Sequence, residues 1–270
     1  MWSVVDDLPP LAHPVRITTD EVIVAVRAIA ANRVGADFAG VRPSAVLVLV
    51  ADDADGNAGV LLTRRSTALR NHAGQISFPG GRLDPGETEI AAALREAHEE
   101  VGLDPAAVEI IGELDHLSTI VSRSHIVPVV GRAVDQLSLA SASPEVERVM
   151  WVPLAEFVRV DTFRAERWSV PPGLGGAQDS TGLGGAQESP GLGGAQDATG
   201  LGGTERVLYF FELDDETVWG ATAHILVDLL TRLRSQGAEA IATPRPRGAR
   251  ASNSNRSRSA APDGRRAPSV

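Results

Sequence analysis

The 270-residue chain contains no cysteine, no lysine and a single tyrosine. The absence of cysteine excludes disulfide bonds, thiol catalysis and cysteine-based zinc sites, and it is consistent with a cytoplasmic protein. No apolar run reaches the roughly 18 residues of a membrane span. The N-terminus also lacks a basic segment followed by an apolar one, so we expect neither a membrane partner nor a secretory signal. All 25 basic residues are arginine, a usage typical of GC-rich bacterial coding sequences.

With 43% apolar residues, the chain can bury a full core, and the order of its elements predicts an α/β fold. We assign an N-terminal extension with a short helix to residues 1–35, the main domain to 36–236 and a disordered basic tail to 237–270. Apolar runs and alternations predict strands at 44–50, 59–65, 75–78, 108–116, 126–134, 147–152, 167–170 and 207–213, and helices at 20–32, 89–101 and 219–236.

Two segments have unusual composition. Residues 173–204 repeat a nine-residue unit of the type GLGGAQDST, which is rich in glycine and lacks the pattern of a calcium-binding nonapeptide roll. We interpret it as a flexible insertion in a hairpin of the main domain. The fold can accommodate it because the entropic cost of closing a loop grows only slowly with loop length. From residue 242 onward, seven arginines face one aspartate. Such a tail could bind nucleic acid nonspecifically, but we expect simple disorder and no specific nucleic-acid partner.

Three carboxylates dominate the helix predicted at 89–101. Glu96, Glu99 and Glu100 are spaced i, i+3 and i+4 and therefore share one face, while Ile90, Leu94, Ala97 and Val101 line the side expected to pack on a sheet. Clustered carboxylates repel one another unless a cation lies among them, and hard oxygen ligands suit Mg²⁺ or Mn²⁺. Such an ion neutralises a diphosphate and activates water. The alternative interpretation is a solvated acidic helix face without a ligand.

The surrounding residues favour the metal site. Residues 81–103 read GRLDPGETEIAAALREAHEEVGL and fit the pattern of G, five residues, E, seven residues, REUxEExGU, where U is aliphatic. This stretch resembles the Nudix box, which implies an α/β/α sandwich with a mixed sheet and a hydrolase of nucleoside diphosphates linked to another group. The resemblance implies Glu96 and Glu100 as metal ligands and Glu99 as a further ligand or base.

Three more residues complete the predicted catalytic set. Arg95 and Glu87 are expected to form an ion pair that fixes the loop before the helix to the helix itself. We count Gly80 among the metal ligands, because a tight turn at 78–81 would bring its backbone close to the metal and the phosphates.

The segment before the box predicts the substrate. Residues 61–81, LLTRRSTALRNHAGQISFPGG, resemble the LLTxRSxxLRxHxGxxxFPGG stretch of the coenzyme A pyrophosphatase branch of Nudix proteins. That branch cuts coenzyme A or its thioesters to 3′,5′-ADP and a 4′-phosphopantetheine species. Arginine forks recognise phosphate well, and the run is basic in a chain of net charge −10. The predicted substrate-binding residues are Arg64, Arg65, Arg70, His72 and Phe78.

Several alternatives stay open. The substrate could instead be another nucleoside diphosphate derivative or a nucleoside triphosphate, and a third hypothesis is a nucleotide-binding module that does not hydrolyse. For His72, a structural hydrogen bond is as reasonable as ligand contact. Glu145 or Glu147, in a segment similar to one near the family's active site, could supply an additional carboxylate. A homodimer is compatible with the sequence.

Overall fold

The structure is a computed structural model that describes residues 2–4, 16–35, 40–69, 72–119, 122–134, 137–159, 161–170 and 204–242. Arg70, the repeat up to residue 203 and the tail from residue 243 therefore lie outside the described residues. Within them, no helix combines the length and the apolarity that crossing a membrane requires.

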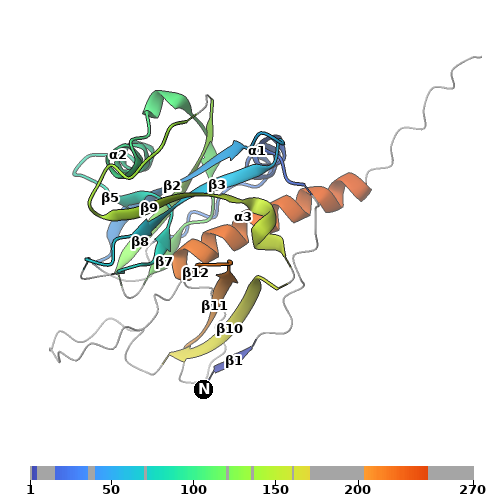
Figure 1. The fold of residues 1–270 in the computed structure, drawn as a ribbon. Helices are drawn as coiled ribbons and strands as arrows, with labels where there is room; N and C mark the ends of the chain where they lie inside the picture. Colours follow the sequence, from blue (N-terminus) through green and yellow to red (C-terminus); the bar gives the residue numbers. More distant parts are fainter. Residues whose placement is uncertain are drawn as a thin grey trace, which may run out of the picture.

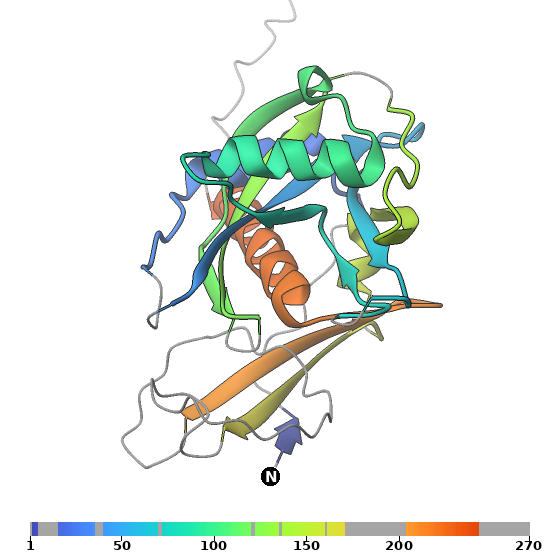
Figure 2. The ribbon, with the colours of Figure 1, turned by 90° about the vertical axis from the view of Figure 1, so that its left-hand side faces the viewer.

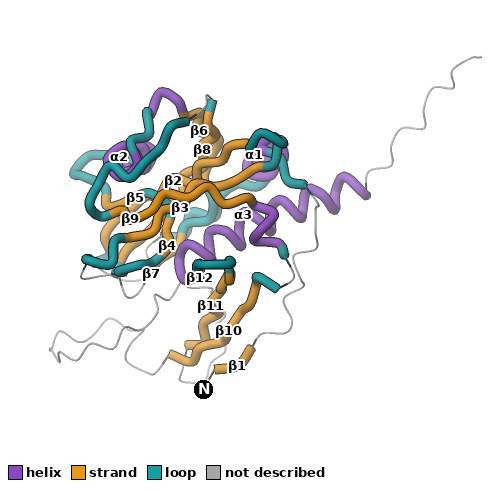
Figure 3. The backbone as a smooth tube through the Cα atoms, in the orientation of Figure 1, coloured by secondary structure: helices purple, strands orange, loops and turns teal. Residues whose placement is uncertain are grey.

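In the described residues, runs of consecutive strands separate the α-helices (Figures 1 and 3). The elements are β1 (Trp2–Val4), α1 (Thr19–Ala28), β2 (Arg42–Asp52), β3 (Ala58–Arg65), β4 (Ile76–Ser77), β5 (Gly80–Arg82), α2 (Glu89–Val101), β6 (Val108–Glu113), β7 (Leu117–Thr119), β8 (Ser124–Ala133), β9 (Val146–Pro153), β10 (Phe163–Val170), β11 (Thr204–Glu212), β12 (Thr217–Trp219) and α3 (Gly220–Ala242), with short 3-10 helices at Pro105–Ala107 and Leu154–Val158.

The main sheet has eight strands and mixed direction. Its central order is β4-β3-β2-β8-β6, with β5 paired to β2, β7 to β8 and β9 to β3. Strands β2 and β8 run parallel, whereas all other pairs in this sheet are antiparallel. The prediction of a mixed sheet is thus confirmed.

Helices cover both faces of this sheet because β2 is apolar on both sides. Ala45, Leu47 and Leu49 belong to the core cluster that includes α2, whereas Val48 and Val50 belong to the cluster that includes α1 and α3. Alternate side chains of a strand point to opposite faces, so an unbroken apolar strand requires cover on both. In Figure 2, α2 lies in front of the strands and α3 behind them. The predicted α/β/α sandwich is the observed architecture.

A second sheet, of order β1-β10-β11-β12, packs against α3 (Figure 1). The hairpin predicted around the repeat is present as the antiparallel pair β10–β11, in which Val170 lies opposite Thr204. The repeat therefore connects two strands that are paired up to their last described residues.

Several element boundaries and one helix face differ from the predictions. Helix α1 ends at Ala28 rather than at 32, because Asn32 instead hydrogen-bonds to Asp115 and His116. Helix α3 continues to Ala242, so the boundary drawn at residue 236 falls inside it. On α2, Ile90 is 39% exposed instead of facing the sheet. Its expected place is taken by Ala92 and Ala93, whose small side chains permit a close approach of helix and sheet.

Helix α3 is tied to the rest of the domain through Arg232, which is 2% exposed. Its guanidinium contacts the carboxylates of Asp228 (2.8 Å) and Asp115, and it donates to the carbonyl oxygen of Ile29 at 2.6 Å. The side chain thereby connects α3, the β6–β7 loop and the segment after α1. Removing one partner from a buried ion pair leaves an unmatched charge, which is strongly destabilising.

We therefore expect Arg232→Met to lower the free energy of unfolding by roughly 2–4 kcal/mol. Urea denaturation monitored by circular dichroism measures this change. The matched control is Arg234→Met, since Arg234 is exposed on the same helix and its loss should change stability by less than about 0.5 kcal/mol. Equal effects of the two substitutions would contradict the structural role of Arg232.

Candidate active site

Local signals in the sequence set the ends of α2. The Thr88 hydroxyl accepts a hydrogen bond from the Ala91 amide at 3.2 Å, which caps the first turn. Gly102 closes the helix in the left-handed conformation, with φ +70°, and donates to the carbonyl oxygens of Ala97 and His98. The helix predicted at 89–101 is thus observed with both of its predicted caps, and Glu96, Glu99 and Glu100 lie in its second half.

The sheet splits next to these carboxylates. Strand β2 pairs with β3 only at its far end, whereas its first half pairs with β5, and the Leu47 amide donates to the carbonyl oxygen of Pro79 at 2.8 Å. The segment from Phe78 to Arg82 is therefore inserted between two strands that diverge. As a result, the β5 backbone lies against the acidic face of α2.

Glycine occupies both contacts of β5. A Cβ atom on Gly80 would lie 2.4 Å from the carbonyl oxygen of Ala45, and one on Gly81 would lie 2.3 Å from Oε1 of Glu96. The contact at Gly80 is with backbone and requires glycine, whereas a side chain at position 81 would have to displace the carboxylate of Glu96. The Gly80 amide donates to Oε2 of Glu100 at 3.3 Å, so the glycine backbone contacts the carboxylate cluster directly.

Arg95 and Glu87 form the predicted ion pair. Two donors of the Arg95 guanidinium bind the two carboxylate oxygens of Glu87 at 2.9 and 3.0 Å, and Arg95 also donates to the carbonyl oxygen of Arg82 at 3.0 Å. The hydrogen bond from Arg95 lowers the pKa of the Glu87 carboxyl below its usual value. The pair thus joins α2 to the loop that precedes it, and a third contact reaches Glu96 at 3.0 Å.

The three carboxylates differ strongly in burial. The Glu99 side chain is 57% exposed, that of Glu96 is 20% exposed and that of Glu100 is 9% exposed. Burial raises the pKa of Glu96, and it raises the pKa of Glu100 to about 7 despite the guanidinium of Arg65 at 3.9 Å. The nearby carboxylates of Glu96 and Glu145 add to the shift of the Glu100 pKa.

Arginines separate the carboxylates from one another. Arg95 contacts Glu96 at 3.0 Å and Glu99 at 3.5 Å, while Glu100 points to Arg65 and Gly80. Consequently, no three acidic or histidine side chains converge on one point in the part of the chain that the structure describes.

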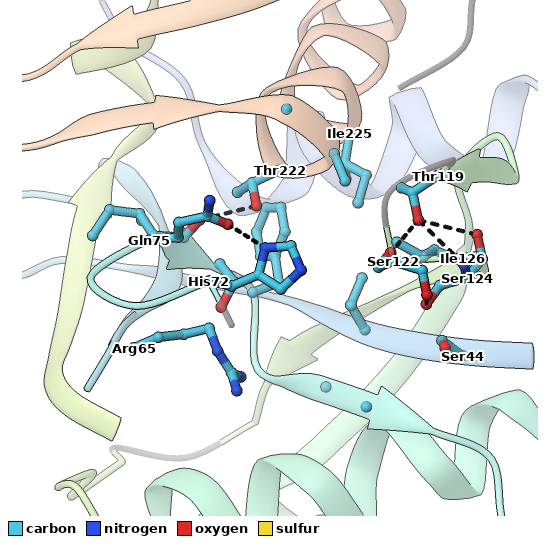
Figure 4. Close-up of a pocket in the computed structure, with 18 of the residues that line it drawn as sticks. Ser44, Arg65, His72, Gln75, Thr119, Ser122, Ser124, Ile126, Thr222 and Ile225 are labelled. Atoms are coloured by element: carbon cyan, nitrogen blue, oxygen red, sulfur yellow. Dashed lines mark hydrogen bonds between the residues drawn. The ribbon is translucent and has the colours of Figure 1, made fainter. Parts of the chain in front are cut away.

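A cavity of about 310 Å³ opens beside Gly80 and Gly81 (Figure 4). Arg65, His72, Phe78 and Gly80 all line it, so four residues predicted from the segment before the box lie together. Arg70 lies outside the described residues.

Arg64 is not brought into this cavity. Successive residues of a strand point to opposite faces, and Arg64 instead contacts Glu216 at 3.4 Å and Glu147 at 4.0 Å. The two additional acidic candidates also lie on opposite sides of the sheet: Glu145 is in the turn before β9, and Glu147 is in β9 itself. Glu145 lies on the active-site side, 3.2 Å from Arg65, whereas Glu147 pairs with Arg64.

The opposite wall of the cavity was not predicted. It carries the hydroxyls of Ser44 near the start of β2, Thr119 at the end of β7 and Ser124 at the start of β8, together with that of Ser122 in the turn between β7 and β8; Figure 4 shows them across from His72. Single serines and threonines at strand ends give no signal in a sequence. Only the register, in which Ser44 lies opposite Ile126 of β8, brings them to one place.

Comparison with known proteins identifies the domain that holds this site. Residues 41–173 match the family described as NUDIX domain. Over these residues the chain is similar to Nudix domains, and we call this part of it the Nudix domain.

Relatives of the Nudix domain come from animals and bacteria. Nudix hydrolase 3 of Caenorhabditis elegans is 42% identical over 111 residues, which cover 39% of this chain and 45% of the relative. A protein of Klebsiella pneumoniae, named uncharacterized Nudix hydrolase NudL, is 46% identical over 106 residues, which cover 39% of this chain and 55% of the relative. The chain thus spans about half the length of these curated relatives.

Solved structures are similar to this chain as well. A MutT/nudix family protein from Enterococcus faecalis has 14% identity and a TM-score of 0.41, covering 82% of this chain and 76% of its own. A binary complex of Ap4A hydrolase from C. elegans has 22% identity and a TM-score of 0.38, covering 44% of this chain and 85% of its own.

The raised pKa of Glu100 predicts a pH-dependent stability of the Nudix domain. A folded-state pKa of about 7, against an ordinary value of 4.5, favours folding at low pH, and this contribution is lost as the pH rises through 7. Glu100→Gln removes the titration. In the presence of a chelator, we expect the variant to gain about 2–3 kcal/mol relative to the parent protein between pH 5 and pH 8.

Urea denaturation at the two pH values measures this gain. Glu99→Gln serves as the control, because Glu99 occupies the same helical turn but is exposed, and it should show little pH-dependent difference. A constant difference between Glu100→Gln and the parent at both pH values would show that burial does not govern this carboxylate.

Proposed function

We propose that the Nudix domain hydrolyses the diphosphate bond of coenzyme A and its derivatives, giving 3′,5′-ADP and 4′-phosphopantetheine or its acylated form. The observation that carries this proposal is the position of Arg65. Its guanidinium lies between the carboxylates of Glu100 and Glu145 and lines the cavity beside Gly80. The basic segment that resembles the coenzyme A branch therefore adjoins the acidic helix of the Nudix box.

Arg65 suits an anionic substrate for a second reason. Its Nε atom is buried and has no hydrogen-bond partner among the described residues. A buried donor without a partner is costly, and a phosphate oxygen would satisfy it. In this role Arg65 would orient the diphosphate at the end of the cavity nearest to α2.

Nudix hydrolases use divalent metal ions, and the residues of this chain fit Mg²⁺ or Mn²⁺. Glu96 and Glu100 supply hard oxygen atoms one helical turn apart. Burial disfavours the charged form of both carboxylates and so raises their pKa values, and a bound cation would offset this cost. Glu96 and Glu100 would hold the ion, with Glu99 as a further ligand or base and Gly80 contributing through its backbone. When bound, the ion supplies charge neutralisation and polarisation of the attacked phosphorus.

The protein groups divide the remaining tasks. Arg95 keeps Glu96 in position through its own attachment to Glu87 and Arg82. A proton must also leave the attacking water, and two carboxylates are suited to accept it: the exposed Glu99 on α2, and Glu145, which lies outside the helix beside Arg65. The apolar and hydroxyl-lined cavity beyond Arg65 would then take an organic part of the substrate.

A panel of substrates tests the specificity. We expect coenzyme A and its thioesters to give the highest kcat/KM when compared with dephospho-coenzyme A, ADP-ribose, NADH and deoxynucleoside triphosphates. Release of 3′,5′-ADP, followed by chromatography, identifies the bond that is cut. If coenzyme A is not among the best substrates, the domain acts on another nucleoside diphosphate derivative. If nothing is hydrolysed with either metal, it is a binding module.

The role of Glu100 is tested by Glu100→Gln, which keeps the shape of the side chain and removes its charge. We expect metal-dependent kcat to fall by a factor on the order of 10²–10³, the usual effect of losing a charged group at the reacting centre. The matched control is Glu89→Gln, since Glu89 is an exposed carboxylate on the first turn of the same helix. Unchanged turnover in Glu100→Gln, with a fold verified by circular dichroism, would remove Glu100 from the site.

A further inference from the structure

The turn between β11 and β12 carries a buried carboxylate that no step of the proposed hydrolysis uses. Oε1 of Glu216 lies 3.4 Å from Nη1 of Arg64 in β3 and 3.5 Å from Nη1 of Arg148 in β9. The side chain of Glu216 is 9% exposed. One carboxylate from the second sheet therefore bridges two arginines of the main sheet.

The two arginines depend on this carboxylate because they are neighbours. Arg64 and Arg148 lie directly opposite each other in the antiparallel register of β3 and β9, so their side chains share one face. Like charges at opposite positions repel each other, and a carboxylate between them offsets the repulsion. Asp215 contacts Arg148 at 2.7 Å and Glu147 lies 4.0 Å from Arg64, so each is next to one arginine. Among the described residues, Glu216 is the carboxylate that joins both.

The turn connects Glu216 rigidly to the strand that follows. The Leu213 amide donates to the carbonyl oxygen of Glu216 at 2.8 Å, which closes the turn. Strand β12 begins at the next residue and ends at Trp219. Gly220, with φ +66°, then leads directly into α3. The position of Glu216 therefore sets the position of β12 and of the start of α3.

The segment after this turn forms one wall of the cavity. Trp219, Thr222 and Ile225 line it, and the Thr222 hydroxyl donates to the carbonyl oxygen of Ile76 in β4 at 3.1 Å. Figure 4 shows Thr222 and Ile225 on the far side of His72 from Arg65. The wall is thus held to the main sheet at two places, at β4 through Thr222 and at β3 and β9 through Glu216.

We propose that Glu216 is a positioning residue, which acts through Trp219 to set the width of the cavity and hence the binding of the organic part of the substrate. Glu216 does not line the cavity itself. The inference rests on the proposed function in that the cavity takes part of the substrate of a hydrolase. It also gives Arg64 a role other than the predicted contact with substrate: Arg64 holds Glu216, while the neighbouring Arg65 lines the cavity.

Steady-state kinetics of Glu216→Gln tests this role, because the variant keeps the shape of the side chain and removes its charge. We expect KM for coenzyme A to rise about tenfold, the low end of what one lost contact in a pocket is worth, with kcat within about twofold of the parent value. A lost wall contact weakens the binding of substrate and transition state alike, so it changes KM and leaves kcat. Arg148→Met removes one partner of Glu216 and should raise KM in the same direction, which tests the role even where Glu216→Gln does not fold.

A double-mutant cycle with Trp219→Ala separates positioning from a general loss of stability. If Glu216 acts through Trp219, Glu216→Gln should raise KM by less than about twofold in the Trp219→Ala background. The matched control is Asp214→Asn, because Asp214 is a carboxylate of the same turn with an 88% exposed side chain. This control should leave both KM and kcat unchanged.

An unchanged KM in Glu216→Gln, with a fold verified by circular dichroism, overturns the proposal, as does a full tenfold effect in the Trp219→Ala background. If coenzyme A is not hydrolysed, the proposed function fails, and KM is measured for the substrate of the panel that is turned over best. If no substrate is turned over, the calorimetric Kd for ADP replaces KM. Weaker binding in Glu216→Gln then supports the positioning role, whereas equal binding, or no binding by the parent, overturns it.

Discussion

The contact between the β5 backbone and the acidic face of α2 is the constraint on which the site depends. Gly81 lies so close to the carboxylate of Glu96 that a Cβ atom would overlap it, and the Gly80 amide donates to Glu100. This approach is possible because β2 and β3 diverge and admit the segment from Phe78 to Arg82 between them. The split in the sheet therefore determines where the carboxylates, the glycine backbone and the cavity meet.

Because of this contact, the acidic cluster lowers the stability of the fold when no ligand is bound. The sheet and β5 bury Glu100 next to Glu96, so burial rather than a partner dominates its pKa. Arg95 and Arg65 offset part of the cost, but they act on different carboxylates and keep them apart. Clustered charge of this kind, retained at the expense of stability, is characteristic of sites that bind a charged ligand.

The sequence predicted the parts of the structure that depend on local signals. The caps at Thr88 and Gly102, the Arg95–Glu87 pair and the apolar strand β2 all follow from residues that are near neighbours or have a clear periodicity. The face of α2 was partly wrong at Ile90, because tertiary packing selected the smaller Ala92 and Ala93 for the close contact with the sheet. Helix propensity and hydrophobic periodicity give no information on the distance between a helix and the sheet on which it packs.

The cavity required knowledge of strand register, which is nonlocal. Arg64 and Arg65 are equivalent in the sequence, and only the pairing of β3 with β4 and β9 decides which one faces the site. The hydroxyls of Thr119 and Ser124 come from the consecutive strands β7 and β8, which are distant along the chain from Ser44 in β2. Their convergence follows from the parallel pairing of β2 with β8, a contact that no short pattern reports.

The position of the repeat follows from the same architecture. Trp219, Thr222 and Ile225 form one wall of the cavity, yet they come after the repeat in the chain. Their placement requires β11 and β12 to be held correctly, and β10 provides this by pairing with β11 from Phe163 to Val170. Because the ends of the insertion are already joined by paired strands, its length adds only a logarithmic entropy cost. An insertion between two strands that were not paired would instead detach this wall from the sheet, so the hairpin is the connection in this part of the domain that best tolerates it.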